Sequence, residues 1–386
     1  MDHLNDLTEE QREVHDRLHS FLIEDDQQEI LFSAAGGTGK SFVIRSLIKT
    51  LAAEGHTIPR MVTFAGRATL HLTSDLTSAT TIHKLLYYPN IDSNGVLIGW
   101  NRKSRVDVQT ECSGGLIVDE SSMVPSEIHN DLLSIGVPIV WVGDDNQLEP
   151  VDPKAEESFC VFFKDLEKLT LTRNMRVMDG KENLLKLNQH LRDPDASMTR
   201  RFSGKGVKFW KRSDAMSPTF HEENQFDVIG CGTHKTRKKL NELVRKARGY
   251  HTEHAQEGEE VRCLKNTIID GCIDVFNGER YRVLSHEKDE NEIGVRHYTL
   301  QSIDFPDKEV TLKIPDCTWT DEKVPYKKGS DLNPFAFGYA CTIHSLQGST
   351  VPKFLFVREN VSFFLDQRRF DYTGVSRASD ELHVTL

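Results

Sequence analysis

A glycine-rich segment, Phe32-Ser33-Ala34-Ala35-Gly36-Gly37-Thr38-Gly39-Lys40-Ser41, sets the fold class of this chain. The apolar run Ile30-Leu31-Phe32 enters it as a predicted buried strand, and apolar side chains recur at helical spacing after it. Glycines between a strand and a helix let backbone N–H groups turn inward around phosphate oxygens, beside the positive end of the helix. The segment therefore predicts a nucleotide phosphate loop, in which Lys40 reaches the terminal phosphates and Ser41 ligates Mg²⁺.

We assign the whole turn to phosphate binding, namely Ala35, Gly36, Gly37, Thr38, Gly39, Lys40 and Ser41. A Gly-Lys-Ser/Thr triplet also arises by chance, roughly 0.1–0.2 times in a chain of this length. Ala34 stands where the usual pattern opens with glycine. The assignment therefore depends on partners later in the chain.

Composition describes an ordinary soluble globular protein. The 386 residues are 38% hydrophobic and 28% charged, which suggests two to three domains. No apolar run approaches a membrane span, and the acidic start is unlike a signal peptide, so we expect a cytoplasmic protein (host cytoplasm if phage-encoded) and no membrane partner. Seven scattered cysteines without a CxxC pair favour reduced, mostly packed thiols over disulfides, zinc or an iron–sulfur cluster.

The net charge of −11 argues against a nucleic-acid partner at first sight. A binding groove needs only local positive potential, however, and basic runs occur at 234–239, 327–328 and 368–369. Each run is more often a solvated face than a binding site. Composition leaves the partner open.

Strands and helices alternate in two stretches of the chain, and this alternation predicts parallel sheets covered on both faces. The first α/β unit takes residues 1–85 and 113–180, and the second takes 181–252 and 331–386. Residues 86–112, with an Asn94-Gly95 turn, read as a β-hairpin inserted in the first unit. Short alternating strands within 253–330 predict a small β-barrel inserted in the second.

Polar side chains follow two further apolar strands. Asp119 and Glu120 come directly after Leu116-Ile117-Val118, and Gln147 follows the strand that ends near Val142. Ligands bind at the carboxyl ends of strands in open α/β sheets. There Asp119 can hold Mg²⁺, Glu120 can orient and deprotonate an attacking water, and the Gln147 amide can bond the γ-phosphate.

In order and spacing, these motifs resemble those of superfamily 1 helicases. The similarity extends over essentially the whole chain, and further matching motifs are Leu7-Thr8-x-x-Gln11, Leu171-Thr172 with Arg176, Tyr339-Ala340-x-Thr342-x-His344-x-x-Gln347-Gly348 and Tyr372-x-x-x-Ser376-Arg377-Ala378. Within the superfamily the chain is most similar to the RecD-like branch and its phage Dda-type helicases. Two departures are Ala34 and the segment 63–68, which lacks the Pro-Thr pair usual in the branch. The β-insert is also shorter than in the phage type.

The resemblance implies two RecA-like P-loop motor domains, with an SH3-like barrel in the second. It implies ATP and Mg²⁺ as cofactors, Gln11, Gln347 and Gly348 as nucleotide contacts, and Arg176 and Arg377 as catalytic arginines beside Lys40, Glu120 and Gln147. The activity implied is 5′-to-3′ movement on single-stranded DNA by a monomer that opens duplex forks, in DNA replication, recombination or repair. Single-stranded-DNA-binding or replisome proteins are the partners that such a role implies.

The same resemblance gives the residues expected to contact DNA, which are Phe64, Arg67, His83, Ile98, Trp100, His234, Lys235, Thr342 and His344. Trp100 or Ile98 would act as a wedge that stacks against the fork, although a tryptophan there could equally be buried against its own domain. Two other functions stay open. One is an RNA helicase or ribonucleoprotein remodeller, which differs in 2′-hydroxyl contacts that a sequence does not display. The other is an ATP-gated binding subunit of a larger complex.

Overall fold

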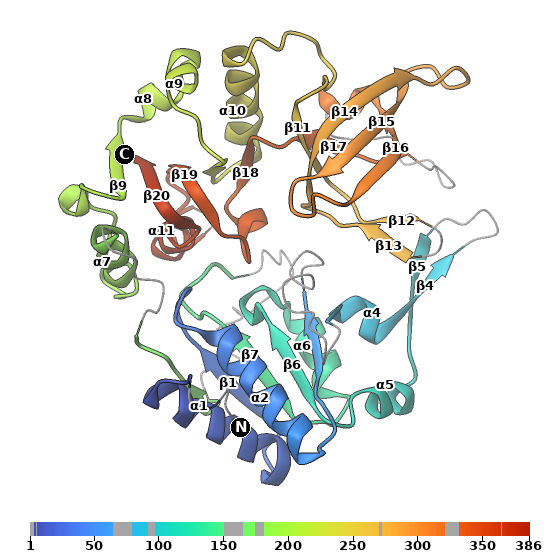
Figure 1. Ribbon diagram of the computed structural model, residues 1–386, viewed down its shortest axis with the longest axis vertical. Coiled ribbons are helices and arrows are strands. Elements are labelled where there is room, and N and C mark those ends of the chain that lie inside the picture. The colour runs from blue at the N-terminus through green and yellow to red at the C-terminus, as the bar shows by residue number, and fades with distance from the viewer. Residues whose placement is uncertain are drawn as a thin grey trace. The chain divides into compact units, whose positions relative to one another are not determined.

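The computed structural model describes residues 4, 6–64, 79–91, 97–149, 165–173, 181–269, 272–320, 332–363 and 365–386. At residues 89, 91, 97, 98, 267–269 and 272–274 it describes the backbone alone. The chain divides into two compact units, the first formed by Met1–Asp92 and Leu97–Met178 and the second by the residues from Asp179 to Leu386 (Figure 1). Each unit is built around a parallel sheet.

The first unit holds a six-stranded sheet in the order β3-β2-β6-β7-β1-β8, and every neighbouring pair in it is parallel. Its strands are β1 (Glu29–Ser33), β2 (Arg60–Thr63), β3 (Thr80–Thr81), β6 (Leu116–Asp119), β7 (Ile139–Gly143) and β8 (Lys168–Leu169). Its helices are α1 (Glu9–Glu24), α2 (Lys40–Glu54), α4 (Ile82–Leu86), α5 (Arg105–Glu111), η2 (Ser121–Met123) and α6 (Ser126–Leu133). This is the parallel α/β sheet that the alternating pattern predicts.

Side chains of β1 alternate between two buried layers. Phe32 packs into a core with residues of α1 and α2, whereas Leu31 packs into a second core that contains Leu85 of α4 and Leu132 of α6. Because successive side chains of a strand point to opposite faces, the two cores lie on opposite faces of the sheet. The continuous apolar sequence of the strand is explained by this double burial.

Strands β4 (Tyr87–Ile91) and β5 (Leu97–Arg102) pair antiparallel, with Tyr87 opposite Arg102 and Pro89 opposite Trp100. The Asn94-Gly95 turn expected between them lies outside the described residues. Trp100 therefore sits within a strand pair and not in the turn.

The second unit contains a five-stranded parallel sheet in the order β18-β10-β19-β20-β9. Its strands are β9 (Val207–Trp210), β10 (Val228–Cys231), β18 (Ala340–Thr342), β19 (Val351–Val357) and β20 (Ala378–Thr385). The helical elements are α7 (Glu182–His190), η4 (Arg200–Phe202), α8 (Arg212–Ala215), α9 (Pro218–Glu223), α10 (His234–Ala247), η6 (His344–Leu346) and α11 (Gln367–Val375). The amphipathic α10 buries Leu240 and Val244 in a core with Leu355 and Val357 of β19.

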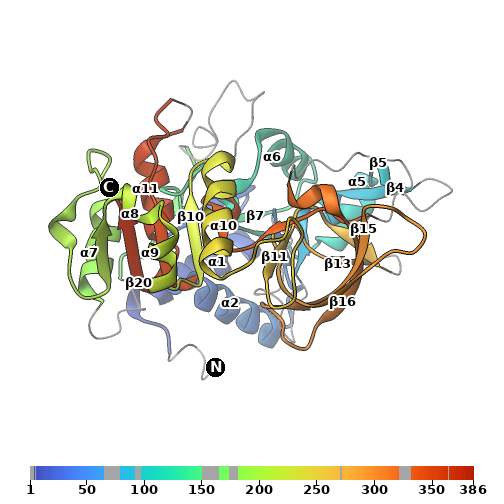
Figure 2. The same cartoon turned by 90° about the horizontal axis from the view of Figure 1, so that it is seen from above.

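An antiparallel sheet in the order β16-β15-β14-β11-β17 interrupts this unit. Its strands are β11 (Glu260–Cys263), β14 (Arg280–Lys288), β15 (Val295–Ser302), β16 (Glu309–Pro315) and β17 (Phe335–Phe337), with η5 (Asp316–Trp319) after β16 and a separate antiparallel pair, β12 (Thr267–Ile269) and β13 (Cys272–Val275). Figures 1 and 2 both place this sheet at one end of the unit and β9 and β20 at the other. Its classification as an SH3-like barrel stays a prediction. Among the described helices, none has the length and apolar character needed to cross a membrane.

Candidate functional site

The phosphate loop joins β1 to α2 through two glycines in left-handed backbone conformations. Gly37 has a φ of 84° and Gly39, the N-cap of α2, has a φ of 98°. A Cβ atom on Gly39 would lie 2.4 Å from Nε2 of Gln11. The backbone angle of Gly39 therefore favours glycine, and a larger residue would also displace the Gln11 amide from its place beside the loop.

Ala34, which replaces the usual opening glycine, is fully buried in the core under α1 and α2. Its N–H donates to the carbonyl oxygen of Gly143 at 3.0 Å, continuing the pairing of β1 with β7. The methyl group fills core space instead of facing the loop. This placement explains why alanine is accepted at the entry of the loop.

The ammonium group of Lys40 folds back over its own loop. Its Nζ donates to the carbonyl oxygen of Ala34 and, at 3.2 Å, to that of Ala35. The Thr38 hydroxyl donates to the same Ala35 carbonyl at 2.8 Å. The lysine charge is thus held at the mouth of the turn, where phosphate oxygens would take the place of the carbonyls.

The carboxyl ends of β1, β7 and β6 lie side by side, because these strands are parallel neighbours with Ser33 opposite Gly143 and Val118 opposite Trp141. This order brings Lys40, Asp119 and Gln147 to one edge of the sheet. Burial, followed by the charge of Glu120, raises the pKa of Asp119 to about 7, and the charge of Lys40 opposes this rise. The predicted convergence of the three motifs is observed within this unit.

Glu120 has φ 51° and ψ 43°, and it is the one non-glycine residue with positive φ in the described part of the chain. A left-handed conformation costs a residue with a Cβ of order 1–3 kcal/mol and is typical of functional sites. It occurs directly between Asp119 and η2. This strain indicates that the orientation of the Glu120 carboxylate matters for function.

Gln147 is buried at the end of the β7 loop, and its backbone N–H donates to the carbonyl of Asp144 at 3.0 Å. The Asp144 carboxylate accepts the backbone N–H of Asn146 at 3.2 Å, while Asp145 exchanges hydrogen bonds with Ser33 of β1. The loop that carries the amide is therefore fixed to the strand before the phosphate loop.

The donor set at this edge fits a divalent cation. Two hydroxyl oxygens near Asp119, Oγ1 of Thr63 and Oγ of Ser122, are buried without a hydrogen-bond partner. Thr63 lies opposite Asp119 in the β2–β6 register. Mg²⁺ prefers carboxylate and hydroxyl oxygens of this kind as ligands, and its charge would add to that of Lys40 in compensating the buried carboxylate. Ser41 at the start of α2 and Asp119 are the residues that would hold it.

Gln11 contacts the phosphate loop directly. Its Nε2 donates to the carbonyl of Thr38 at 3.1 Å, and its Oε1 accepts the backbone N–H of Thr8 at 3.1 Å in a capping box at the start of α1. The side chain is buried. The glutamine thus fixes the loop to α1, and its predicted contact with the adenine base stays a prediction.

In the second unit, Arg377 is buried beside the Gln347-Gly348 turn. Its guanidinium donates to the carbonyls of Leu346 (3.3 Å) and Ser349 (3.2 Å), and also to Thr373 and Ser376. Gly348 has a φ of 75°. Two separate sequence motifs, both predicted to contact nucleotide, are thus joined in one hydrogen-bonded group. The charge of the guanidinium strengthens each of these bonds relative to a bond between neutral groups.

The residues of this unit predicted to contact DNA occupy two places. The Thr342 hydroxyl donates to Oγ of Ser345 at 3.1 Å, and Ser345 also accepts from Arg262 of β11 at 3.1 Å; His344 begins η6 beside them. His234 and Lys235 are exposed in the first turn of α10. Ser345 was not among the predicted residues, although it lies inside the motif that carries Thr342 and His344.

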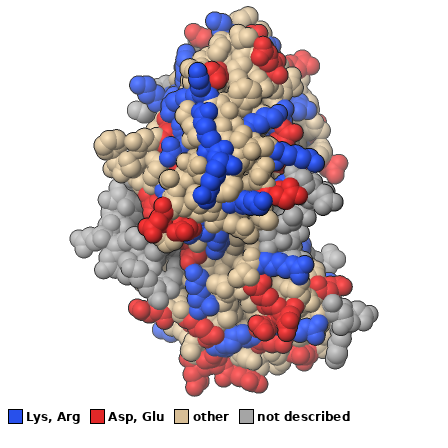
Figure 3. All heavy atoms as spheres, turned by 90° about the vertical axis from the view of Figure 1, so that its left-hand side faces the viewer, with Lys and Arg blue, Asp and Glu red and all other residues tan. Residues whose placement is uncertain are grey.

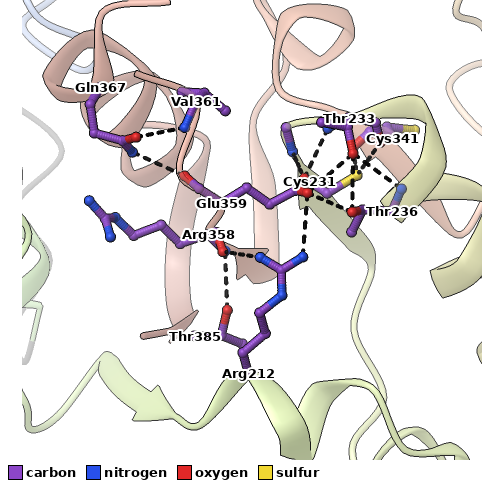
Figure 4. Close-up of polar contacts among 11 residues, drawn as sticks. Arg212, Cys231, Thr233, Thr236, Cys341, Arg358, Glu359, Val361, Gln367 and Thr385 are labelled. Carbon is purple, nitrogen blue, oxygen red and sulfur yellow. Dashed lines mark hydrogen bonds and ion pairs between the residues drawn. The ribbon is translucent and has the colours of Figure 1, made fainter. Parts of the chain in front are cut away.

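Glu359, which the sequence did not single out, is buried at the N-terminus of α10 (Figure 4). Its carboxylate accepts the backbone N–H groups of Gly232 (2.6 Å) and Thr233 (2.9 Å) and the hydroxyl of Thr236 (2.6 Å). Arg212 approaches it at 3.4 Å. The sequence offers one signal for this role. Glu359 lies two residues beyond the end of β19, and that end pairs with the end of β10, directly before α10.

On the first unit, His83 and three other aromatic side chains form a group. Its ring centroid lies 5.9 Å from that of Phe64, 5.8 Å from Tyr87 and 6.1 Å from Trp100. Trp100 is 42% exposed. Burial lowers the pKa of His83 below its usual value. Three predicted DNA contacts, with Tyr87 as an addition, thus share one surface, and Trp100 both packs on its own unit and faces solvent.

Figure 3 shows Lys and Arg side chains gathered on one face of the second unit. In the sequence from η4 to the start of α8, the exposed basic residues are Arg200, Arg201, Lys205, Lys208 and Lys211. Lys208 lies on β9, the edge of the sheet, where lysine also prevents pairing with other strands. Local positive charge therefore exists despite the negative total. Of the predicted residues, Arg67, Arg176 and the side chain of Ile98 lie outside what the structure describes.

A family model described as an AAA domain matches residues 23–153, which include the phosphate loop, Asp119 and Gln147. No curated protein matches the sequence.

Among solved structures, the chain is similar to Pif1 helicases. One structure concerns DNA unwinding at forked double-stranded DNA by two coordinating Pif1 helicases (TM-score 0.63, 17% identity, 98% of this chain and 92% of the other). Another is Pif1 from Bacteroides with ADP-AlF3 and single-stranded DNA (TM-score 0.62, 17% identity, 98% and 92%). A third is Pif1 from Candida albicans (TM-score 0.55, 18% identity, 98% and 94%). These likenesses establish that the chain has the fold of Pif1 helicases, over nearly its whole length.

Proposed function

We propose that this chain is an ATP-driven DNA helicase of superfamily 1 that moves 5′-to-3′ on single-stranded DNA and opens duplex forks as a monomer. The observation that carries the proposal is the meeting of Lys40, Asp119, Glu120 and Gln147 at one edge of the first sheet. A phosphate loop, a carboxylate pair and a buried amide form a set suited to phosphoryl transfer to water. The Pif1-type fold supports the coupling of that reaction to DNA.

Each residue of the first unit has a separable task in the reaction. The N–H groups of the glycine turn bind phosphate oxygens, and Lys40 neutralises their charge. Glu120 orients the attacking water and accepts its proton, while the Gln147 amide bonds the terminal phosphate. Mg²⁺ held by Ser41 and Asp119 would screen the charge of the phosphates.

Arg377 is proposed to supply positive charge to the transferred phosphoryl group. Arginines in this role are worth roughly 10³–10⁵ in turnover. Its present bonds to the carbonyls of Leu346 and Ser349 link it to the turn that holds Gln347. A change at the phosphate would therefore be transmitted to Thr342 and His344, which precede that turn and are proposed to contact the DNA backbone.

The aromatic group around His83 is proposed as a stacking surface for bases. Bases stack on exposed aromatic rings without sequence preference, at about 1–3 kcal/mol for each base. With its pKa lowered, His83 is neutral at pH 7, so it would contribute by ring contact and hydrogen bonding and not by charge. Trp100, as the exposed member, is the proposed strand-separating residue.

The proposal is tested first by ATP turnover with and without single-stranded DNA and single-stranded RNA. Strong stimulation by DNA is expected. Stimulation by RNA alone would indicate the RNA helicase instead, and no stimulation by either polymer would exclude a motor.

Unwinding of duplexes with a 5′ or a 3′ tail tests the direction. Only the 5′-tailed duplex should open, and opening of only the 3′-tailed duplex would contradict the branch assignment. Trp100→Ala should lose unwinding while keeping DNA-stimulated ATP turnover. If unwinding and turnover fall together, Trp100 is a packing residue.

A further inference from the structure

Two histidines and a glutamate meet where the second half of α1 packs beside the carboxyl end of α2, away from the phosphate loop. Nε2 of His19 lies 2.5 Å from Oε2 of Glu54, and Nε2 of His56 lies 3.6 Å from the same oxygen. The three ligand atoms are all within 4.8 Å of one another. All three side chains are partly exposed, so an ion from solution could reach them.

Local structure fixes this arrangement. Gln11, His15 and His19 follow one face of α1 at four-residue spacing, and they contact Thr38, Thr50 and Glu54 in turn. The two helices therefore run in the same direction. Glu54 is the last residue of α2, and Gly55, with φ 80°, turns the chain so that the N–H of His56 bonds back to Leu51 at 2.9 Å. This glycine C-cap brings His56 beside Glu54.

The electrostatic surroundings favour a cation. The carboxyl end of a helix carries partial negative charge, and α2, which ends at Glu54, has no basic residue in its last turn. Asp25 follows α1 and Glu54 ends α2, but Asp25 is already paired with Arg17. One carboxylate oxygen of Glu54 faces the imidazoles of both His19 and His56. A bound cation would therefore be neutralised mainly by Glu54.

We propose that His19, Glu54 and His56 bind a zinc-type divalent ion, with water as the fourth ligand. Two imidazole nitrogens and one carboxylate oxygen form a ligand set that zinc accepts in tetrahedral sites, with bonds of about 2.0–2.2 Å. Ligand atoms on such a site are about 3.3 Å apart, so small side-chain movements from the observed separations suffice. His15 stacks on His19 with ring centroids 6.5 Å apart and is itself held by Thr50, which supports the His19 ring from behind.

The ion would join the second half of α1 to the carboxyl end of α2, two helices whose amino ends carry Gln11 and the phosphate loop. It would stabilise the first unit without touching the nucleotide. The inference is independent of the proposed function, because it concerns neither ATP nor DNA.

The test titrates Zn²⁺ alone into the chelator-treated full-length chain, with excess Mg²⁺ present to occupy oxygen sites. Calorimetry should give one Zn²⁺ per chain, and the thermal midpoint should rise with Zn²⁺ concentration as expected for a ligand of the folded state. Co²⁺ in place of Zn²⁺ should give the visible absorption of a tetrahedral site.

His56→Ala is the decisive variant, because His56 is 38% exposed in its side chain and its loss should leave the fold intact. Zn²⁺ affinity should fall about tenfold or more, as it does even for residues that merely support metal ligands. His19→Ala and Glu54→Gln should act alike. His297→Ala is the matched control, since it removes a histidine paired with Asp289 at 2.7 Å without a second imidazole, and it should bind Zn²⁺ normally. Equal binding by His56→Ala and the unaltered chain, or no binding by either, would overturn the site.

Discussion

Helices α2 and α10 both begin at the carboxyl end of a parallel strand, yet their first turns are completed in opposite ways. The N-cap of α2 is Gly39, which has no side chain to make a capping hydrogen bond. The N-cap of α10 is Thr233, whose hydroxyl accepts the N–H of Thr236, and the Glu359 carboxylate takes up two more N–H groups. One helix end is open to an anion, and the other holds an anion of its own.

The difference shows that a glycine-rich turn between strand and helix does not by itself identify a phosphate site. The segment Gly230-Cys231-Gly232-Thr233-His234-Lys235 resembles such a turn in composition. Its glycines, however, serve packing, since a Cβ on Gly230 would lie 2.4 Å from the Phe354 ring and one on Gly232 would lie 2.9 Å from Val361. The presence or absence of an internal carboxylate decides whether the helix end can take a phosphate.

The largest effect should come from removing the charge at the open helix end. Lys40→Ala should lower ATP turnover by about a thousandfold, or ~4 kcal/mol of transition-state stabilisation, because the Lys40 ammonium is the charge of α2 that is held against the loop. Lys49→Ala, an exposed lysine on the same helix, is the control and should turn over normally. Steady-state ATPase assays measure both variants. If Lys40→Ala turns ATP over nearly as fast as the unaltered protein, this loop does not bind the phosphates of ATP.

At the filled helix end, Glu359→Ala should lower the free energy of unfolding by about 3 kcal/mol, since buried N–H groups lose their acceptor. Glu359→Gln keeps an acceptor oxygen and should lose less. Glu222→Ala removes an exposed glutamate of α9 and should change little. Urea unfolding followed by circular dichroism compares the three. A Glu359→Ala midpoint equal to that of Glu222→Ala would mean that the carboxylate contributes no stability.

The open end could be predicted from sequence because its parts are local or follow directly on strands. The phosphate loop is contiguous, and Asp119 and Gln147 each come just after an apolar run. Parallel strands place such residues at one edge whatever their order in the sheet. The positions of Lys40, Asp119 and Gln147 follow from these patterns alone.

The filled end was missed because its parts are distant in sequence. Glu359 and Thr233 are 126 residues apart, and only the pairing of β10 with β19 brings them together. The burial of Ala34 and the contact of Gln11 with Thr38 also depend on packing between elements, which a pattern of residue types does not specify. The same holds for Trp100, whose place within a strand pair sets its contact with His83.

The glycines at the two ends of α2, Gly39 and Gly55, test whether ATP binding depends on the position of Gln11 beside the phosphate loop. Both Gly39 and Gly55 have a left-handed backbone that is unfavourable for alanine. In Gly39→Ala the added Cβ would also lie 2.4 Å from Nε2 of Gln11, whereas in Gly55→Ala it would have no atom within 4 Å. Each should cost about 1 kcal/mol of stability, but only Gly39→Ala should also weaken ATP binding, by roughly tenfold, because Gln11 and the loop must shift. Binding of a fluorescent ATP analogue and urea unfolding measure the two effects. Equal ATP affinity in both variants would show that the position of Gln11 does not matter to the loop.

The smallest effect tests whether the two helix ends can be interchanged. Removing the carboxylate in Glu359→Ala should leave the N–H groups of Gly232 and Thr233 without that acceptor, so that the positive end of the α10 dipole, like that of α2, faces no capping carboxylate. Inorganic phosphate should then restore part of the lost stability, on the order of 0.5–1 kcal/mol, by binding the folded state. Chloride at equal ionic strength controls for screening, and Glu359→Gln, which still fills the site, should gain less from phosphate. If phosphate stabilises both variants equally, it does not act at the vacated helix end, and the proposed equivalence of the two helix ends is wrong.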